Sequence, residues 1–118
     1  MKVMIVEDEV LLALETKFEL NSMGCEVTGI ANSSEVAIDM LSRKVPDLIL
    51  MDIVIQGQMN GIELTKVVAD KFPACKVIYV TAYSDETILS KVKQSRHAGI
   101  MNKPFEPYRL TQILERAS

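Results

Sequence analysis

Short apolar runs alternate with longer segments of helical spacing along all 118 residues of this chain. We expect strands at 2–7, 25–31, 47–52, 76–81 and 98–102, and helices at 9–23, 33–44, 61–72, 84–96 and 106–117. The expected strands are rich in β-branched residues and almost continuously apolar, which is typical of strands buried on both faces. Strict alternation of such strands with helices predicts one parallel sheet covered by helices on both sides. The sequence therefore predicts an α/β, doubly wound fold with five parallel strands and five helices, formed by residues 1–118 as a single domain.

Residues at the expected element boundaries agree with this pattern. Asn32, Ser33 and Ser34 can cap the second helix, and Gly24 can end the first one. The run Ser84-Asp85-Glu86 offers a cap and acidic residues at the start of the fourth helix.

Length and composition exclude several classes of protein. A chain of 118 residues can bury a substantial core, roughly two-thirds of the unfolded surface. A net charge of −3 gives no electrostatic case for nucleic-acid binding. No apolar stretch is long enough to cross a membrane, and Glu7 comes too early for a signal peptide. We therefore expect a cytoplasmic protein in which Cys25 and Cys75 are buried, reduced thiols.

Polar residues follow the expected strands at the points where the strands end. Glu7, Asp8 and Glu9 follow the first strand, and Asp52 ends the third. Thr81 ends the fourth strand, and Lys103 follows the fifth. The carboxyl ends of parallel strands meet at one edge of a sheet, where open α/β sheets bind their ligands. We therefore expect these residues to share one crevice.

The acids in this group predict a magnesium site. Like charges ~4 Å apart repel by about 4 kcal/mol at an effective dielectric constant near 20. Bringing Glu7, Asp8 and Asp52 together is therefore costly unless a cation lies among them. Carboxylates with few other protein ligands suit Mg²⁺, which keeps several waters and also binds phosphate oxygens. The backbone carbonyl of Val54 could supply one more ligand.

Thr81 and Lys103 complete a site for a phosphoryl group. The Lys103 ammonium can pair with Asp52 or with phosphoryl oxygens, and the Thr81 hydroxyl can donate to such an oxygen. Ala82 leaves room for the group, while Pro104 points to a fixed peptide bond after the lysine, for which cis is an open alternative.

With these residues in view, the chain resembles the receiver domains of two-component response regulators. The matching stretches are Met4–Glu9, Pro46–Ile53, Asn60–Leu64, Thr81-Ala82 and Lys103–Phe105. The resemblance covers essentially the whole chain and implies the flavodoxin-like strand order 2-1-3-4-5.

The resemblance also implies a function. Asp52 would accept a phosphoryl group from a phosphohistidine on a sensor histidine kinase or a histidine phosphotransfer protein. Glu7, Asp8 and Asp52 would hold Mg²⁺, and Thr81 and Lys103 would bind the phosphoryl oxygens. The domain would then change conformation to regulate a partner or an output domain. It would catalyse its own phosphorylation and slow dephosphorylation without being a conventional turnover enzyme.

Two positions depart from the usual receiver pattern. Ile100 stands three residues before Lys103, where the family usually has Tyr or Phe as a switch residue. Either Ile100 simply packs in the last strand, or the conformational change is muted or rerouted. Val54, two residues after Asp52, has no group to orient a water molecule, which predicts slow self-dephosphorylation. Tyr83 is an alternative control of water access.

Two further features concern possible phosphate donors. His97 is the only histidine, and we interpret it as a surface residue because the chain lacks a kinase-type helical hairpin. The first helix has more apolar residues than one buried stripe needs, and we expect most of them to lie in the core: Leu11, Leu12, Leu14, Phe18, Leu20 and Met23. An exposed remainder of these residues beside Asp52 would suit docking of a donor helix.

Three rival functions fit the sequence less well. A phosphatase of the haloacid dehalogenase type would need an acid where Val54 stands, and a flavodoxin-like carrier would need a glycine-rich phosphate loop where Glu7–Glu9 stand. The stronger rival is a receiver-like protein–protein interaction module that acts without phosphorylation. The complete set of acids, Thr81 and Lys103 argues against it, whereas Ile100 leaves it open.

Overall fold

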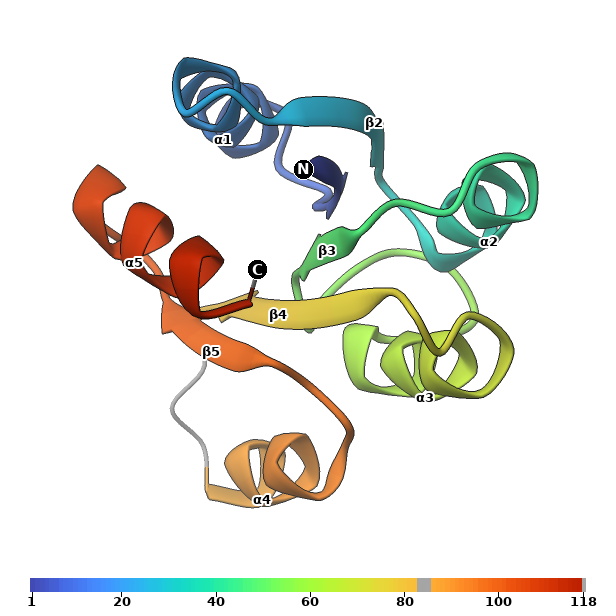
Figure 1. The fold of residues 1–118 in the computed structure, drawn as a ribbon. Coiled ribbons are helices and arrows are strands. Elements are labelled where there is room, and N and C mark those ends of the chain that lie inside the picture. Colours follow the sequence, from blue (N-terminus) through green and yellow to red (C-terminus); the bar gives the residue numbers. More distant parts are fainter. Residues whose placement is uncertain (83–85, 118) are drawn as a thin grey trace.

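The computed structural model describes residues 1–82 and 86–117, and these residues form a parallel sheet between two layers of helices (Figure 1). The strands within this part of the chain are β1 (Lys2–Val6), β2 (Glu26–Ala31), β3 (Leu48–Met51), β4 (Lys76–Thr81) and β5 (Gly99–Asn102). The helices are α1 (Val10–Ser22), α2 (Ser34–Arg43), α3 (Gly61–Lys71), α4 (Glu86–Gln94) and α5 (Pro107–Ala117). These bounds lie within a few residues of the sequence-based expectations.

The strand order is β2-β1-β3-β4-β5, and every neighbouring pair of these strands is parallel. This order and the parallel pairing confirm the expected doubly wound fold. Because β1 lies between β2 and β3, the order of strands reverses beside β1, which places a crevice at the carboxyl ends of β1 and β3.

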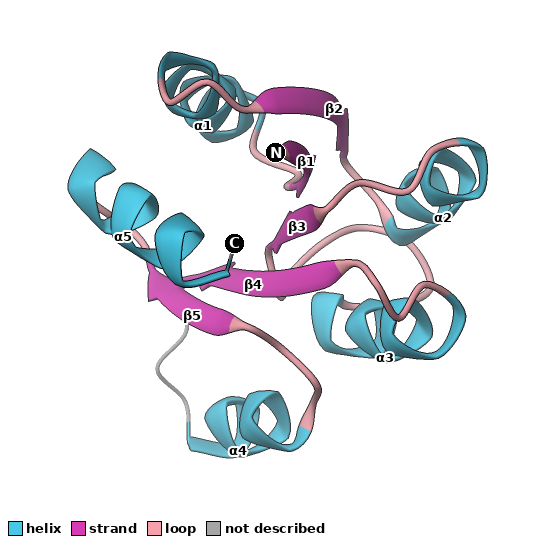
Figure 2. Ribbon diagram, viewed as in Figure 1, coloured by secondary structure: helices cyan, strands magenta, loops and turns pink. Residues whose placement is uncertain are grey.

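Helices cover both faces of the sheet (Figure 2). Each face has its own apolar core. Helices α1 and α5 cover one face, packing Leu20 and Leu110 against strand residues such as Ile5 and Ile78. Helices α2, α3 and α4 cover the other face, where Leu41, Leu64 and Val92 are fully buried or nearly so. Burial on both faces explains why the strands read as continuous apolar runs.

Several helix boundaries follow the expected local chemistry. The Ser33 hydroxyl accepts a hydrogen bond from the Val36 N–H and caps α2. Gly24 follows α1 with φ of +85°, a conformation that favours glycine. The expected cap at Ser84 and Asp85 lies outside the described residues. Asn60 and Glu63 form a reciprocal capping box at the start of α3, which the sequence-based interpretation had missed.

Candidate functional site

The acidic residues come together because β1 and β3 are adjacent and in register. Val6 pairs with Met51, so Glu7 and Asp52 follow neighbouring strand ends. The Asp52 N–H donates to the Val6 carbonyl at 3.0 Å. Carboxylate oxygens of Glu7, Asp8 and Asp52 all lie within 4.8 Å of one another. Glu7 and Asp52 are buried, whereas Asp8 is half-buried.

Lys103 reaches this acid cluster from the end of β5. Its Nζ lies 2.6 Å from Glu7 Oε1 and 3.0 Å from Asp52 Oδ2. The Lys103 N–H donates to the Thr81 carbonyl at 2.9 Å, which ties the lysine backbone to the end of β4. The peptide bond between Lys103 and Pro104 is cis, the alternative that the sequence left open. The lysine therefore supplies a positive charge to two of the three acids.

Burial and charge act in opposite directions on the groups in this cluster. Burial raises the pKa of Glu7 to about 7, against a lowering effect of the hydrogen bond from Lys103. Burial alone would lower the pKa of Lys103, but the hydrogen bonds to Glu7 and Asp52 more than offset it, so the net shift is upward. The lysine is therefore a permanent cation, whereas Glu7 titrates near neutral pH.

The acid cluster opens into a cavity of about 330 Å³ at the carboxyl edge of the sheet. Its lining residues are Asp8, Glu9, Asp52, Val54, Ala82 and Lys103. Three carboxylates within metal-binding reach of one another, beside a solvent-accessible space, fit the ligand preference of Mg²⁺. The Lys103 side chain, which lines the same cavity beside these acids, fits a phosphate-sized anion.

The threonine predicted for this site lies at the expected edge but is buried. Thr81 is 1% exposed, and the cavity is lined by its neighbour Ala82. Val54 does line the cavity, and its side chain is exposed. Its N–H donates to Asp52 Oδ1 at 3.3 Å, so the segment that follows Asp52 turns back toward that carboxylate. Tyr83, the alternative control of water access, lies outside the described residues.

Ile100 packs in β5, which is compatible with both interpretations of this position. It is half-buried against the core on the side of α2, α3 and α4. Its partner on β4 is Tyr79, which is fully buried. The Tyr79 hydroxyl lies 2.8 Å from the Ser95 hydroxyl, beyond the end of α4. An aromatic ring therefore lies next to the switch position, on the neighbouring strand.

Two single-residue predictions need correction. His97 was interpreted as a surface residue, but it is half-buried, and its ring packs edge-on against Tyr79 with centroids 5.5 Å apart. Its Nδ1 is buried and has no hydrogen-bond partner among the described residues. Cys25 is only half-buried, whereas Cys75 is buried and free as expected. Burial raises the pKa of the Cys75 thiol to about 11.

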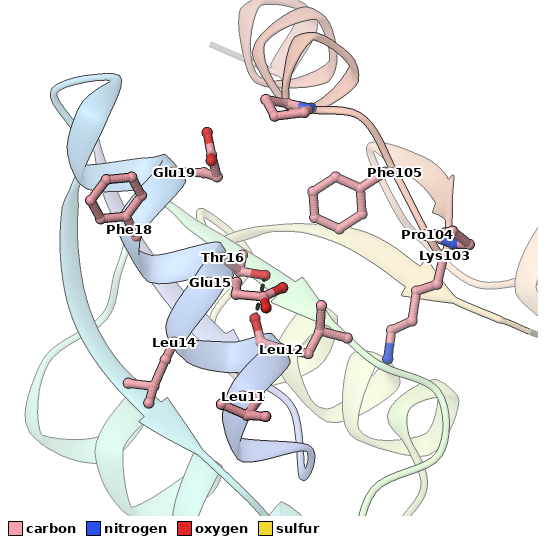
Figure 3. A pocket seen from close by; sticks show the side chains of 11 residues that line it. Leu11, Leu12, Leu14, Glu15, Thr16, Phe18, Glu19, Lys103, Pro104 and Phe105 are labelled. Atoms are coloured by element: carbon pink, nitrogen blue, oxygen red, sulfur yellow. Dashed lines mark hydrogen bonds between the residues drawn. The ribbon is translucent and has the colours of Figure 1, made fainter.

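An apolar groove adjoins the acid cluster on the α1 side of the domain. It encloses about 490 Å³ between α1 and the segment that joins β5 to α5. Figure 3 shows Leu12 and Phe105 facing this space, with Lys103 at one end. Leu11, Leu14 and Phe18 on α1 are 76%, 51% and 69% exposed, so the expected apolar remainder exists, but it is larger than expected because most of the apolar residues of this helix were expected in the core. Phe105 was not recognised as part of this surface from the sequence.

The strand order, the acid cluster and the lysine at the carboxyl edge together define a signalling receiver. A family model for the response regulator receiver domain matches residues 3–115. The chain therefore belongs to the response regulator receiver domain family. No helix in the described part of the chain has the length and apolar character needed to cross a membrane.

Individual relatives differ in how much of their length this chain covers. The chemotaxis protein CheY of Thermotoga maritima is 27% identical over 117 residues, which span 99% of this chain and 97% of that protein. The DNA-binding transcriptional regulator NtrC of Escherichia coli K12 is 30% identical over 115 residues, which span 98% of this chain but 24% of that protein. The phyllosphere-induced regulator PhyR of Methylorubrum extorquens is likewise covered over only 43% of its length.

Solved structures show the same likeness in three dimensions. The signal receiver domain of a modulated diguanylate cyclase from Desulfovibrio desulfuricans G20 superimposes with a TM-score of 0.91. It is 28% identical, and the match covers 98% of this chain and 91% of that one. The isolated receiver domain of RcsB from Salmonella enterica has a TM-score of 0.90 at 25% identity, with 98% of this chain and 86% of that chain covered.

Proposed function

We propose that residues 1–118 form one receiver domain that accepts a phosphoryl group on Asp52 from a phosphohistidine. The observation that carries the proposal is the position of the Asp52 carboxylate. It is buried between two acids and the Lys103 ammonium, which lies 3.0 Å from its Oδ2, and it opens into the edge cavity. A carboxylate held beside a fixed cation in this way is poised as a nucleophile toward phosphorus.

In the proposed reaction an Asp52 oxygen forms a bond to phosphorus as the phosphorus–nitrogen bond of the donor breaks. The histidine keeps the electron pair of that bond and takes up a proton. Lys103 offsets the charge on the transferring oxygens, because its ammonium already lies at the wall of the cavity. The Thr81 hydroxyl would bind one oxygen after the end of β4 has moved, since Thr81 is buried and Ala82 faces the cavity instead.

Glu7, Asp8 and Asp52 would hold Mg²⁺, and the Val54 carbonyl would complete the protein ligands. The ion would add positive charge for the transferring phosphoryl oxygens. The mutual approach of the three carboxylates to within 4.8 Å supports this assignment. Val54 offers no polar side chain to orient an attacking water, so we propose that the acyl phosphate hydrolyses slowly. Loss of the phosphoryl group within seconds would contradict slow hydrolysis.

The donor would be a sensor histidine kinase or a histidine phosphotransfer protein, docked on the groove beside α1. The exposed apolar side chains of Leu11 and Phe18 support this, because apolar surface beside a reactive carboxylate suits a partner helix. The phosphorylated domain would regulate a partner or an output domain. A cytoplasmic location is part of the proposal and fits two cysteines that are free thiols.

The proposal is tested by Mg²⁺-dependent labelling with acetyl phosphate, followed by intact mass measurement. We expect one added phosphoryl group on the wild type and none on Asp52→Asn. Asp70→Asn is the matched control, because Asp70 is an exposed aspartate on α3, away from the acid cluster. Failure of the wild type to gain the phosphoryl group would favour the rival function, an interaction module that works without phosphorylation. The observation that favours this rival is Ile100, which stands at the switch position in place of an aromatic residue.

A further inference from the structure

The loop that follows Asp52 is bound to the start of α2, an element outside the phosphorylation site. The Ser34 N–H donates to the Gln56 carbonyl at 3.0 Å, and Ser33 and Gln56 form an isolated parallel bridge. The first backbone N–H groups of a helix have no acceptor within the helix. Here the N–H of Ser34 binds the loop instead.

Two side chains from α2 hold the same loop from the other direction. Glu35 Oε1 accepts a hydrogen bond from the Gln58 N–H at 2.9 Å, and Ser34 Oγ accepts one from the Met59 N–H at 3.3 Å. The Ser34 hydroxyl in turn donates to the Glu35 carboxylate at 3.1 Å. The Gln58 N–H, followed by the Ser34 hydroxyl, keeps the pKa of Glu35 below its usual value. Consecutive backbone donors of the loop thus have their acceptors on adjacent α2 residues.

Gly57 lets the loop approach these side chains closely. Its φ is +104°, in the left-handed region that favours glycine. A Cβ at this position would lie 2.3 Å from Glu35 Oε1 and 2.5 Å from Ser34 Oγ. A side chain at position 57 would therefore be strained by the backbone angle and would displace the Glu35 carboxylate and the Ser34 hydroxyl from the loop.

Val54 lies between this contact and a second fixed point. On the Asp52 side, the Gly61 N–H donates to the Ile53 carbonyl at 2.7 Å, and the Val54 N–H donates to Asp52 Oδ1. On the other side, the carbonyl of Gln56 is bound to α2. The short segment that contains Val54 is consequently held at both ends beside the edge cavity.

We propose that Glu35, supported by Ser34, is a positioning residue that sets magnesium affinity by holding the Val54 segment beside the acid cluster. This inference rests on the proposed function, because it assumes that Val54 contributes a ligand. It extends the metal site to α2, which supplies no ligand itself. Groups that hydrogen-bond directly to metal ligands typically change metal affinity by about 10- to 100-fold when they are removed. Glu35 binds Gln58 and not a ligand, so we expect an effect at the lower end of this range.

The test measures Mg²⁺ binding by titration calorimetry and the rate of phosphorylation by acetyl phosphate as a function of Mg²⁺ concentration. Glu35→Ala removes the acceptor for Gln58, whereas Glu35→Gln keeps an acceptor oxygen and loses only the charge. For Glu35→Ala we expect Mg²⁺ affinity to fall by about tenfold, with the maximal rate at saturating Mg²⁺ unchanged. Glu35→Gln should bind Mg²⁺ nearly as the wild type does. Asp39→Ala is the control, because Asp39 is an exposed acid on the same helix whose carboxylate pairs with Arg43.

Three outcomes would overturn the inference. Unchanged Mg²⁺ affinity in Glu35→Ala would do so, as would a lower maximal rate with no change in Mg²⁺ dependence, which would indicate general damage to the fold. An equal loss of Mg²⁺ affinity in Glu35→Ala and Glu35→Gln would also do so, because it would show that the charge of Glu35 sets the affinity and that its hydrogen bond to Gln58 does not. Should Glu35→Ala fail to fold, Ser34→Ala removes the acceptor for Met59 and is expected to raise the Mg²⁺ requirement in the same direction. A wild type that neither binds Mg²⁺ nor gains a phosphoryl group would instead refute the proposed function itself.

Discussion

The Lys103 ammonium lies 2.6 Å from Glu7 Oε1, so the lysine that was expected to pair with Asp52 also forms an ion pair with Glu7. This pairing leaves Glu7 partly compensated, yet burial still raises its pKa to about 7. Proton binding and metal binding at this carboxylate are therefore in competition near neutral pH.

We expect Mg²⁺ affinity to fall as the pH decreases from 8 to 6. Mg²⁺ requires the carboxylate form of Glu7, and below the pKa of about 7 a proton must first leave. The apparent affinity then falls by up to about tenfold per pH unit for one displaced proton. Titration calorimetry in two buffers of different ionisation enthalpy counts the released protons. An affinity that stays constant across this range would contradict the expectation.

The same shift has the opposite consequence for the metal-free protein. The pKa of Glu7 is raised on folding, so the folded state holds this proton more tightly than the unfolded state. The resulting stabilisation is fully present below the usual glutamate pKa and is lost as the pH rises through about 7. Urea unfolding without Mg²⁺ should show this loss in the wild type, and Glu7→Gln should remove it. An identical pH profile in both proteins would argue against a titrating Glu7.

The contact of Gly61 with the Asp52 backbone predicts a position that tolerates no side chain. A Cβ on Gly61 would lie 2.0 Å from the Asp52 carbonyl oxygen and 2.8 Å from the Ile53 Cα, which are backbone atoms that cannot rotate away. We expect Gly61→Ala to destabilise the protein by about 1–3 kcal/mol or more and to slow phosphorylation of Asp52. Guanidinium unfolding and acetyl phosphate labelling measure the two effects.

Gly29→Ala is the matched control for that substitution. Its Cβ would meet the terminal methyl of Met40, a flexible side chain that can move aside. We expect a smaller loss of stability and normal labelling for this variant. Equal losses in the two alanine variants would show that the backbone contact at Gly61 is not the cause.

The Tyr79 hydroxyl is expected to contribute to stability through Ser95. Tyr79→Phe removes a buried hydrogen bond of 2.8 Å, while Ser95 keeps its bond to the Val92 carbonyl. We expect a loss of about 1 kcal/mol in the free energy of unfolding. Ser95→Ala and the double variant complete a cycle that isolates the pairwise term. Tyr108→Phe is the control, because Tyr108 is 61% exposed and should change little.

We expect phosphorylation to change the α4, β5 and α5 side less than it does in receivers with an aromatic switch. Ile100 has neither a hydroxyl nor a flat ring, and it is held in the core beside Tyr79. Amide chemical shifts before and after phosphorylation measure the extent of the change. Shifts that spread across that whole side would show that an isoleucine transmits the signal as well as an aromatic residue does.

A substitution on the exposed face of α1 should slow phosphorylation by protein donors without affecting phosphorylation by small-molecule donors. Phe18→Glu places a charge on the apolar surface beside the groove without touching the acid cluster. We expect about a tenfold or greater loss of phosphotransfer from a phosphohistidine protein, with labelling by acetyl phosphate unchanged. Val45→Glu is the control, because Val45 is a 46% exposed valine between α2 and β3. Parallel losses with both kinds of donor would place the defect in the reaction site.

Much of the fold could be predicted because it depends on local patterns. Short continuous apolar runs such as Leu48–Met51, alternating with segments of helical spacing, predict parallel strands buried on both faces, and the polar residues after them are then expected at one edge of the sheet. The order of the strands followed from the family resemblance, and the pairing of β1 with both β2 and β3 confirms it. Element ends differ by a residue or two where capping residues had been counted as helix: the expected helix 9–23 includes Glu9 and Met23, which the structure has as the caps of α1.

The sequence by itself determined the α/β fold and the candidate set of acids, lysine and threonine, because strand pattern and strand ends are properties of neighbouring residues. Only the tertiary structure decided which of these groups touch. The Lys103 ammonium binds both Glu7 and Asp52. Thr81 is buried, and its neighbour Ala82 lines the cavity. Glu35 accepts a hydrogen bond from the loop after Asp52. These relationships join residues far apart in the chain, whose distances depend on how strands and helices pack. No local pattern of residues encodes them.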